Sequence, residues 1–276
     1  MRCGCAEAFP INTSVKPDFD LKIIPPDLRD AFSDHADAIC SNCGLYQAYK
    51  RFSGPQIAMI NGIGKDALTT DEIYHSYPVP EEFINDWFGD SVERQRRRWG
   101  SLFHELGVTP KRILVLRHWF GRQFPMLVEE FGAEVFGVDI SPICNRYVAE
   151  HYPFVRQLAG TINGELSGPF LSGEPFDIVI VQHILVHSVD VPKALAAIRH
   201  MLRNGGVVVL SAETKRAPSN PFHTFYPSEY QTVSMLSEVF DEVYKLDEQG
   251  IIRDIPIYGY SGRATEFAAV VKPAAS

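Results

Sequence analysis

Two close pairs of cysteines near the start of the chain have a spacing that suits a metal site. The first pair is Cys3 and Cys5, and the second is Cys40 and Cys43, which a glycine follows. Tetrahedral zinc is often held by two such pairs that the fold brings together. We therefore expect residues 1–50 to bind one structural zinc through these four cysteines, with a set of unrelated reduced thiols as the alternative.

Two polar side chains stand where buried strands are expected to end. Asp139 follows the apolar segment 135–138, and Gln182 ends the apolar segment 176–182. In a doubly wound sheet, ligands bind outside the carboxyl ends of the strands. Asp139 is therefore placed to accept hydrogen bonds from ribose hydroxyl groups, with capping of the helix that begins near Ser141 as the alternative. We expect Asp139 and Gln182 to face one cleft.

The turn after the first expected strand differs from a usual nucleotide-binding turn. It runs from Arg117 to Gly121, has the sequence Arg-His-Trp-Phe-Gly, and contains a single glycine. Such turns are normally rich in glycine, because the backbone must approach the ligand closely. The frame of a nucleotide site is therefore present, but its expected floor carries bulky side chains.

Two histidines follow the strand that is expected to end at Gln182. His183 and His187 are predicted to lie near the mouth of the cleft. An unperturbed histidine titrates near neutrality, so either side chain suits a general base. A hydrogen-bonded structural histidine is the alternative for both.

The elements that must position these residues follow from hydrophobic periodicity. Residues 111–215 alternate short apolar runs with amphipathic stretches, which predicts a mostly parallel sheet with helices on both faces. Strands are expected at 113–116, 135–138, 154–159, 176–182 and 207–211, with an antiparallel pair at 240–246 and 265–272. The fold class is α/β: a doubly wound, Rossmann-like domain at 111–276, a connecting and helical segment at 51–110, and the zinc module at 1–50.

Composition limits the classes of function. The 276 residues are 45% hydrophobic and carry a net charge of −8, which argues against a general nucleic-acid binder. The one basic cluster, at 94–98, is interpreted as a solvated helix face. No apolar run is long enough for a membrane span, and the first residues lack the apolar core of a signal peptide, so we expect a cytoplasmic protein.

Several segments together resemble class I S-adenosylmethionine-dependent methyltransferases. The matching segments are RILVL, GAEVFGVDIS, FDIVIVQHILVHSVDVPKALAAIRHMLRNGGVVVLS and EFAAVVKP. The third is the most specific, because it is similar to the acidic-strand, "H-x-x-D-P" and "L-x-P-G-G" stretch of the family. The cysteine pairs, with CSNCGLYQAY, resemble the zinc-binding module that precedes some sugar C-methyltransferases.

The resemblance assigns cofactor-binding roles to Arg117, Gly121, Asp139 and Gln182. The family's glycine-rich turn falls on Arg117 to Gly121, with glycines where Arg117 and Trp119 stand; the ribose-binding acid falls on Asp139, and Gln182 faces the methionine part of the cofactor. Large side chains in the turn occupy space that this part normally needs. Either the turn is shifted and the cofactor binds differently, or the pocket is filled. Arg117 is also suited to recruit a carboxylate or phosphate.

The resemblance places His223 and Tyr226 on the acceptor side of the site, with a surface turn as the alternative. It implies S-adenosylmethionine as cofactor and a small polar acceptor, with a sugar or sugar nucleotide favoured by the zinc module. His183 or His223 would then remove the acceptor's proton. A non-catalytic partner subunit on the same fold, and an enzyme that uses a different cofactor, are the alternatives. The sequence predicts no oligomeric state.

Overall fold

The computed structural model describes eleven stretches of the chain. They are residues 8–11, 37–40, 46–48, 81–139, 142–160, 173–183, 185–188, 190–213, 225–248, 250–252 and 264–272. For residues 8–11, 37–40, 46–48, 81–90, 142–143, 159, 187, 213, 225–226, 252 and 264 only the backbone is described.

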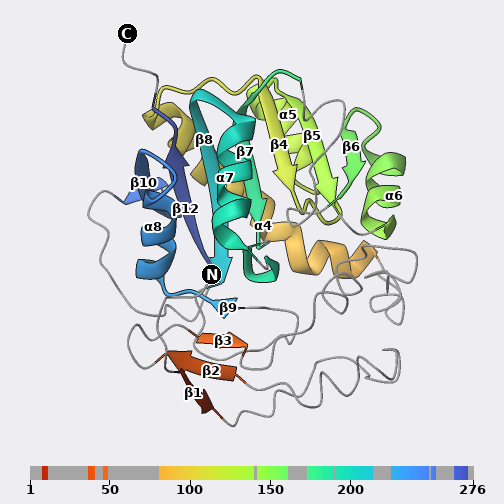
Figure 1. Ribbon diagram of the computed structural model, residues 1–276. Coiled ribbons are helices and arrows are strands. Elements are labelled where there is room, and N and C mark those ends of the chain that lie inside the picture. The colour runs from red at the N-terminus through yellow and green to blue at the C-terminus, as the bar shows by residue number, and fades with distance from the viewer. Residues whose placement is uncertain are drawn as a thin grey trace.

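An eight-stranded sheet forms the centre of the described structure, in the order β11-β10-β12-β8-β7-β4-β5-β6 (Figure 1). Its strands in chain order are β4 (Arg112–Leu116), β5 (Glu134–Asp139), β6 (Arg156–Ala159), β7 (Phe176–Gln182), β8 (Leu202–Glu213), β10 (Glu242–Asp247), β11 (Gly250–Ile252) and β12 (Ala264–Val270). The strands β6, β5, β4, β7 and β8 run parallel, and β12, β10 and β11 follow as antiparallel neighbours. The predicted mixed α/β sheet and its antiparallel closing pair are confirmed.

The strand order reverses at the centre of this sheet. From β4 the chain moves outward through β5 and β6, and it then returns to the other side of β4 with β7 and β8. The carboxyl ends of β4 and β7 therefore flank the topological switch point, where α/β sheets of this kind bind ligands.

Helices cover both faces of the sheet. One face packs against α4 (Glu81–Glu105), α5 (Phe124–Phe131) and α6 (Pro142–His151), and the other against α7 (Val191–Met201) and α8 (Glu229–Ser237). In Figure 1, α7 lies in front of the sheet and α4 behind it. Side chains of β4 alternate between the two cores: Ile113 and Val115 join the first, and Leu114 and Leu116 join the second. This alternation buries the strands on both faces, as a parallel sheet requires.

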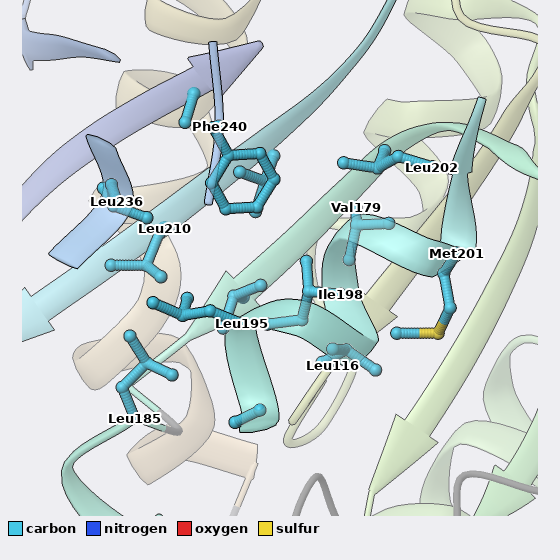
Figure 2. Packing of buried hydrophobic residues seen from close by; sticks show 14 of the residues in the cluster. Leu116, Val179, Leu185, Leu195, Ile198, Met201, Leu202, Leu210, Leu236 and Phe240 are labelled. Carbon is cyan, nitrogen blue, oxygen red and sulfur yellow. The ribbon is translucent and has the colours of Figure 1, made fainter. Parts of the chain in front are cut away.

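The core between α7 and the sheet consists of aliphatic side chains in close contact. Figure 2 shows Leu195 and Ile198 of α7 among Leu116, Val179 and Leu210 of the strands. These five residues are at most 1% exposed. Burial of a leucine or isoleucine side chain contributes about 1.5–3 kcal/mol, so this layer fixes the strand ends that carry the site.

One strand begins earlier than predicted. The strand expected at 207–211 starts at Leu202, because an irregularity in its pairing with β7 accommodates the residues between Leu202 and Val207. Gly205, at φ 78°, donates its N–H to the carbonyl of Val271 at 2.7 Å. The Gly205-Gly206 pair therefore lies within the strand.

A second, four-stranded antiparallel sheet has the order β1-β2-β3-β9. Its strands are β1 (Ala8–Ile11), β2 (Asp37–Cys40), β3 (Tyr46–Ala48) and β9 (Phe225–Tyr226). In Figure 1 it lies beyond the edge at which β4 and β5 end. A segment that the sequence assigned to an irregular zinc module thus contributes three strands, and β9 joins them to the main domain.

Candidate active site

The turn after β4 keeps the backbone path of a glycine-rich turn. Arg117, Trp119 and Gly121 have φ values of 59°, 54° and 65°, so every second residue is left-handed. The N–H of Arg117 continues the sheet by donating to the carbonyl of Val138 at 2.7 Å. A left-handed conformation costs a residue with a side chain roughly 1–2 kcal/mol. The turn has therefore kept the conformation that glycine adopts without cost, although two positions carry large side chains.

The side chain of Arg117 spans the switch point. Its Nη1 donates to the carbonyl of His183 at 2.7 Å, which joins the residues that follow β4 and β7. Its guanidinium carbon lies 4.6 Å from the centre of the Trp119 ring, a distance typical of a cation–π contact. His183 itself has φ 48°, so three left-handed residues with side chains gather at this place.

Asp139 ends β5 and is held in the interior. Its side chain is 4% exposed, and Oδ2 accepts the backbone N–H of Trp119 at 2.9 Å. A carboxylate that accepts a backbone N–H gains a charge-assisted hydrogen bond. The turn and the strand-end acid are thus locked to each other. Helix capping beside Ser141 is not described, because residue 141 lies outside the described part.

A buried histidine, His118, holds the same two residues, Trp119 and Asp139, in place through further hydrogen bonds. His118 is 1% exposed, and its two ring nitrogens lie 2.7 Å from the carbonyl of Trp119 and 3.2 Å from Oδ1 of Asn145. Asn145 in turn donates Nδ2 to the carbonyl of Asp139 at 3.1 Å. A side chain at Gly137 would collide with the His118 ring, since an added Cβ lies 2.7 Å from its Cδ2. Sequence reasoning overlooked this network, although a glycine inside a strand signals a close approach.

Gly121 is required by its own surroundings. An added Cβ would lie 2.4 Å from the Phe124 ring and 2.9 Å from Val148. The glycine is therefore needed both for its left-handed φ and for packing against α5 and α6. Its backbone remains beside the pocket described next.

A pocket of about 320 Å³ opens along the carboxyl ends of β4, β7 and β8, on the side covered by α4. This volume lies at the lower end of the range for small-molecule sites. The pocket is bounded by α4, by the turn and by polar strand ends; its lining residues are Ser91, Val92, Arg94, Gln95, Arg98, His118, Trp119, Phe120, Gly121, Arg122, Gln123, Gln182, His183, Ser211 and Glu266.

Three polar side chains form a row across the floor of this pocket. Gln182 of β7 pairs in register with Ser211 of β8, and Ser211 pairs with Glu266 of β12. Each is at most 9% exposed. Ser211 donates Oγ to Glu266 at 3.2 Å, and Arg98 of α4 donates Nη1 to the same carboxylate at 2.6 Å. This polar row is a preformed set of donors and acceptors that faces the pocket.

The structure brings some of the expected site residues together. Gln182 and His183 line the pocket beside the turn, whereas Asp139 is not among the described lining residues and only bonds to one of them, Trp119. Tyr226 lies in β9, where only its backbone is described, and the same holds for Cys40 in β2. Cys3, Cys5, Cys43 and His223 lie outside the described residues. Within the described part, no group of three or more metal-ligating side chains occurs.

The arginines of α4 were interpreted too simply. The cluster at 94–98 was expected to be a solvated helix face, but Arg94 and Arg98 line the pocket, and Arg98 is paired with Glu266. Arg97 does lie exposed. The spacing of Arg94 and Arg98, four residues apart on one helix face, was the available signal.

Comparison with known proteins supports the fold. Residues 120–210 match a family described as "Methyltransferase domain", and this match begins just after the altered Arg117–Trp119 positions. No curated protein matches the sequence significantly. No helix in the described part is long and apolar enough to cross a membrane.

Three solved structures illustrate the likeness. The 1,6-didemethyltoxoflavin-N1-methyltransferase of Burkholderia thailandensis, with 1,6-didemethyltoxoflavin and S-adenosylhomocysteine bound, is 18% identical over 87% of this chain and 96% of that chain, with a TM-score of 0.54. The citrinin polyketide synthase CMeT domain is 18% identical over 74% and 60%, with a TM-score of 0.54. An O-methyltransferase family protein of Burkholderia thailandensis is 11% identical over 80% and 68%, with a TM-score of 0.53.

The lengths of the matched chains differ. This chain spans 51% of the CurJ carbon methyltransferase structure, about half its length, and 96% of the toxoflavin N1-methyltransferase. At these identities the likeness concerns the fold. Residues 120–210 thus match a methyltransferase-domain family, and the fold of the chain is similar to that of the solved 1,6-didemethyltoxoflavin-N1-methyltransferase.

Proposed function

We propose that the protein is an S-adenosylmethionine-dependent methyltransferase that acts on a small polar metabolite, with a sugar or sugar nucleotide as the favoured acceptor. The observation that carries this proposal is the turn of Arg117, Trp119 and Gly121. It retains the left-handed backbone of a glycine-rich turn and is fastened to the strand-end acid Asp139. A purely structural domain gains nothing from two left-handed residues with large side chains, because each costs stability.

The residues at the strand ends suit the cofactor. Asp139 would accept hydrogen bonds from the ribose, the backbone at Gly121 would follow the cofactor closely, and Gln182 would contact its methionine part. The cofactor supplies an activated methyl group on a sulfonium ion. The chain's own contribution is to bind, to orient the acceptor in line with that methyl group and to exclude water. Arg117 would contribute only after it leaves the carbonyl of His183.

Three residues are proposed to handle the acceptor. His183 lines the pocket and is half-buried, so its imidazole is placed to take a proton from an acceptor hydroxyl or amine. His223 and Tyr226 follow from the family resemblance, and β9, which contains Tyr226, contacts the 3-10 helix Leu185–His187, which lies two residues after the pocket residue His183 in the chain. These roles agree with an acceptor that approaches from the side of the four-stranded sheet.

A second candidate is a non-catalytic binding or partner subunit. The specific observation in its favour is the Arg117 side chain, which joins the ends of β4 and β7 and stacks on Trp119. In this arrangement the side chains fill the place that the methionine part of the cofactor needs. The two candidates therefore differ in whether Arg117 moves when cofactor is present.

Calorimetric titration of the full chain with S-adenosylhomocysteine and S-adenosylmethionine tests the proposal. An active enzyme is expected to bind both with a dissociation constant in the micromolar range, equivalent to about −8 kcal/mol. Absence of saturable binding at millimolar concentration would favour the partner subunit. Release of S-adenosylhomocysteine in the presence of sugar nucleotides would identify the acceptor class.

The structural zinc remains part of the proposal. Its four cysteines are Cys3, Cys5, Cys40 and Cys43, and the case rests on their paired spacing. Elemental analysis after metal-replete expression is expected to give one zinc per chain. A content below about half an equivalent would contradict the site. Because the favoured sugar acceptor rests on the resemblance of this module, loss of the zinc site would also weaken that choice.

A further inference from the structure

The pocket is basic within an acidic protein. Among its described lining residues are three arginines, Arg94 and Arg98 from α4 and Arg122 directly after the turn, and one carboxylate, Glu266. The whole chain carries a net charge of −8. Such a local reversal of charge attracts anionic ligands into a cleft.

The charges of these three arginines are not equally engaged. Arg98 is neutralised by Glu266 at 2.6 Å. Arg94 is exposed and makes no ion pair within the described part of the chain. Arg122 hydrogen-bonds the Tyr152 hydroxyl. Burial raises the pKa of that hydroxyl, with a smaller opposing effect of Arg122.

A buried donor lies at the same end of the pocket. Gln123 lines the pocket next to Arg122 and is only 5% exposed. Its Nε2 has no hydrogen-bond partner within the described residues, and it makes no side-chain cap for α5. A buried amide without a partner costs about 1–3 kcal/mol, and a hydrogen bond to a bound ligand would remove this cost.

We propose that Arg94, Arg122 and Gln123 bind an anionic group, a phosphate or a carboxylate, of the acceptor substrate. The term acceptor rests on the proposed methyltransferase function; the anion site rests on the pocket itself. Arginine and amide N–H groups are the donors that such oxygen-rich groups prefer.

The position of the pocket favours the acceptor as the source of the anion. Asp139, the expected ribose ligand, ends β5 and does not line the pocket. The polar row extends from β7 to β12, on the other side of β4. The described lining thus extends from the turn away from β5, to the side of β4 opposite the ribose position. The carboxylate of the cofactor is the other possible source.

The test is calorimetric titration of the full chain with inorganic pyrophosphate, alone and with S-adenosylhomocysteine present. The variants are Arg94→Gln and Arg122→Gln, and the control is Arg97→Gln, which removes an exposed arginine of the same helix outside the pocket. Each pocket variant is expected to weaken pyrophosphate binding about tenfold, the loss of one charge-assisted contact, whereas the control changes it less than about twofold. Arg94→Gln alters an exposed side chain, so its fold is expected to persist and circular dichroism checks this.

The outcomes separate the two proposals. The protein could bind pyrophosphate, with weaker binding in Arg94→Gln, and not bind S-adenosylhomocysteine. This outcome would support the anion site and refute the methyltransferase proposal. Absence of pyrophosphate binding in the wild type, or an equal loss in Arg97→Gln, would overturn the anion site. If the pocket variants weaken S-adenosylhomocysteine and leave pyrophosphate unchanged, the anion is the cofactor's carboxylate and the acceptor assignment is wrong.

Discussion

Nη1 of Arg117 donates to the carbonyl oxygen of His183 at 2.7 Å, across the gap between the ends of β4 and β7. These two strands flank the switch point of the sheet, so one side chain closes the place where ligands of such folds bind. The same arginine stacks on Trp119, and all three residues are left-handed. Arg117 and His183, the two residues that this hydrogen bond joins, are both in a strained left-handed conformation. Such strain favours release of the contact, so the arginine side chain is suited to move away from the switch point.

Replacement of Arg117 by glycine is expected to open the switch point. The variant loses the hydrogen bond to His183 and the stacking on Trp119, but it gains about 1 kcal/mol from relief of the left-handed strain. We expect tighter binding of S-adenosylhomocysteine by calorimetry, with little net change in the free energy of unfolding.

Arg117→Ala is the matched control for strain. It opens the same space but keeps a side chain at φ 59°. It should therefore match Arg117→Gly in affinity and be about 1 kcal/mol less stable. Weaker cofactor binding in both variants would instead mean that Arg117 is a ligand of the cofactor, as the family resemblance assigns.

Asp139→Ala is expected to weaken cofactor binding by about 1.5–3 kcal/mol, the range for hydrogen bonds to a charged group. The variant also releases the Trp119 N–H, so some loss of stability is expected as well. Asp190→Ala separates the two effects, because Asp190 also accepts a backbone N–H, from Lys193 at 3.1 Å, but caps α7 away from the pocket. It should cost about 1 kcal/mol of stability and leave the affinity unchanged. If Asp139→Ala leaves tight binding intact, the cofactor is held elsewhere.

Much of the fold follows from local sequence pattern. The strand at 176–182 is found with its predicted bounds, and the helix expected to begin near Ser141 begins at Pro142. The C-cap at Gly132 is left-handed at φ 63°, as a glycine there predicts. These features depend on periodicity and on the conformational freedom of single residues, both of which the sequence displays directly.

The floor of the pocket depends on pairing between distant segments. Ser211 and Glu266 become neighbours only because β12 pairs antiparallel with β8 in one register. A shift of one residue would turn Glu266 to the opposite face. Arg98 adds a contact over 168 positions of sequence. No local pattern specifies these relations, so the polar row could not be predicted, although the strand ends at Asp139 and Gln182 could.

The turn shows a different limit of sequence reasoning. Arg117 and Trp119 stand where the family that the chain resembles has glycines, which predicted either a shifted turn or a filled pocket. The structure combines a backbone that is left-handed at Arg117 and Trp119 with an Arg117 side chain that bonds to the carbonyl of His183 across the switch point. Conformational cost alone did not decide the backbone path, because the Trp119 N–H contact with Asp139 and the burial of His118 stabilise it.

Gly121→Ala is expected to destabilise the protein strongly. The added methyl group would lie 2.4 Å from the Phe124 ring and would also impose a left-handed φ on alanine. We expect a loss of about 3 kcal/mol in the free energy of unfolding, measured with urea. Gly132→Ala is the control, because Gly132 has nearly the same φ but no atom within 4 Å of an added Cβ; it should lose only about 1 kcal/mol. Equal losses would mean that φ alone makes Gly121 necessary.

The ion pair of Arg98 with Glu266 is expected to behave as a coupled, buried unit. The two side chains are 18% and 9% exposed, and Arg98 also donates Nε to the carbonyl of Asp247 at 2.6 Å. Arg98→Met leaves a buried carboxylate that keeps the hydrogen bond from Ser211, so we expect a loss of about 3–5 kcal/mol in the free energy of unfolding. The double variant Arg98→Met with Glu266→Gln removes both charges and should recover part of that loss.

The control is an exposed ion pair, Arg199 with Asp241. Their side chains are 38% and 40% exposed, and Nη1 lies 3.4 Å from Oδ2. Arg199→Met should cost less than about 1 kcal/mol. Urea unfolding of the single and double variants measures the coupling energy, and strictly additive losses would contradict the coupling.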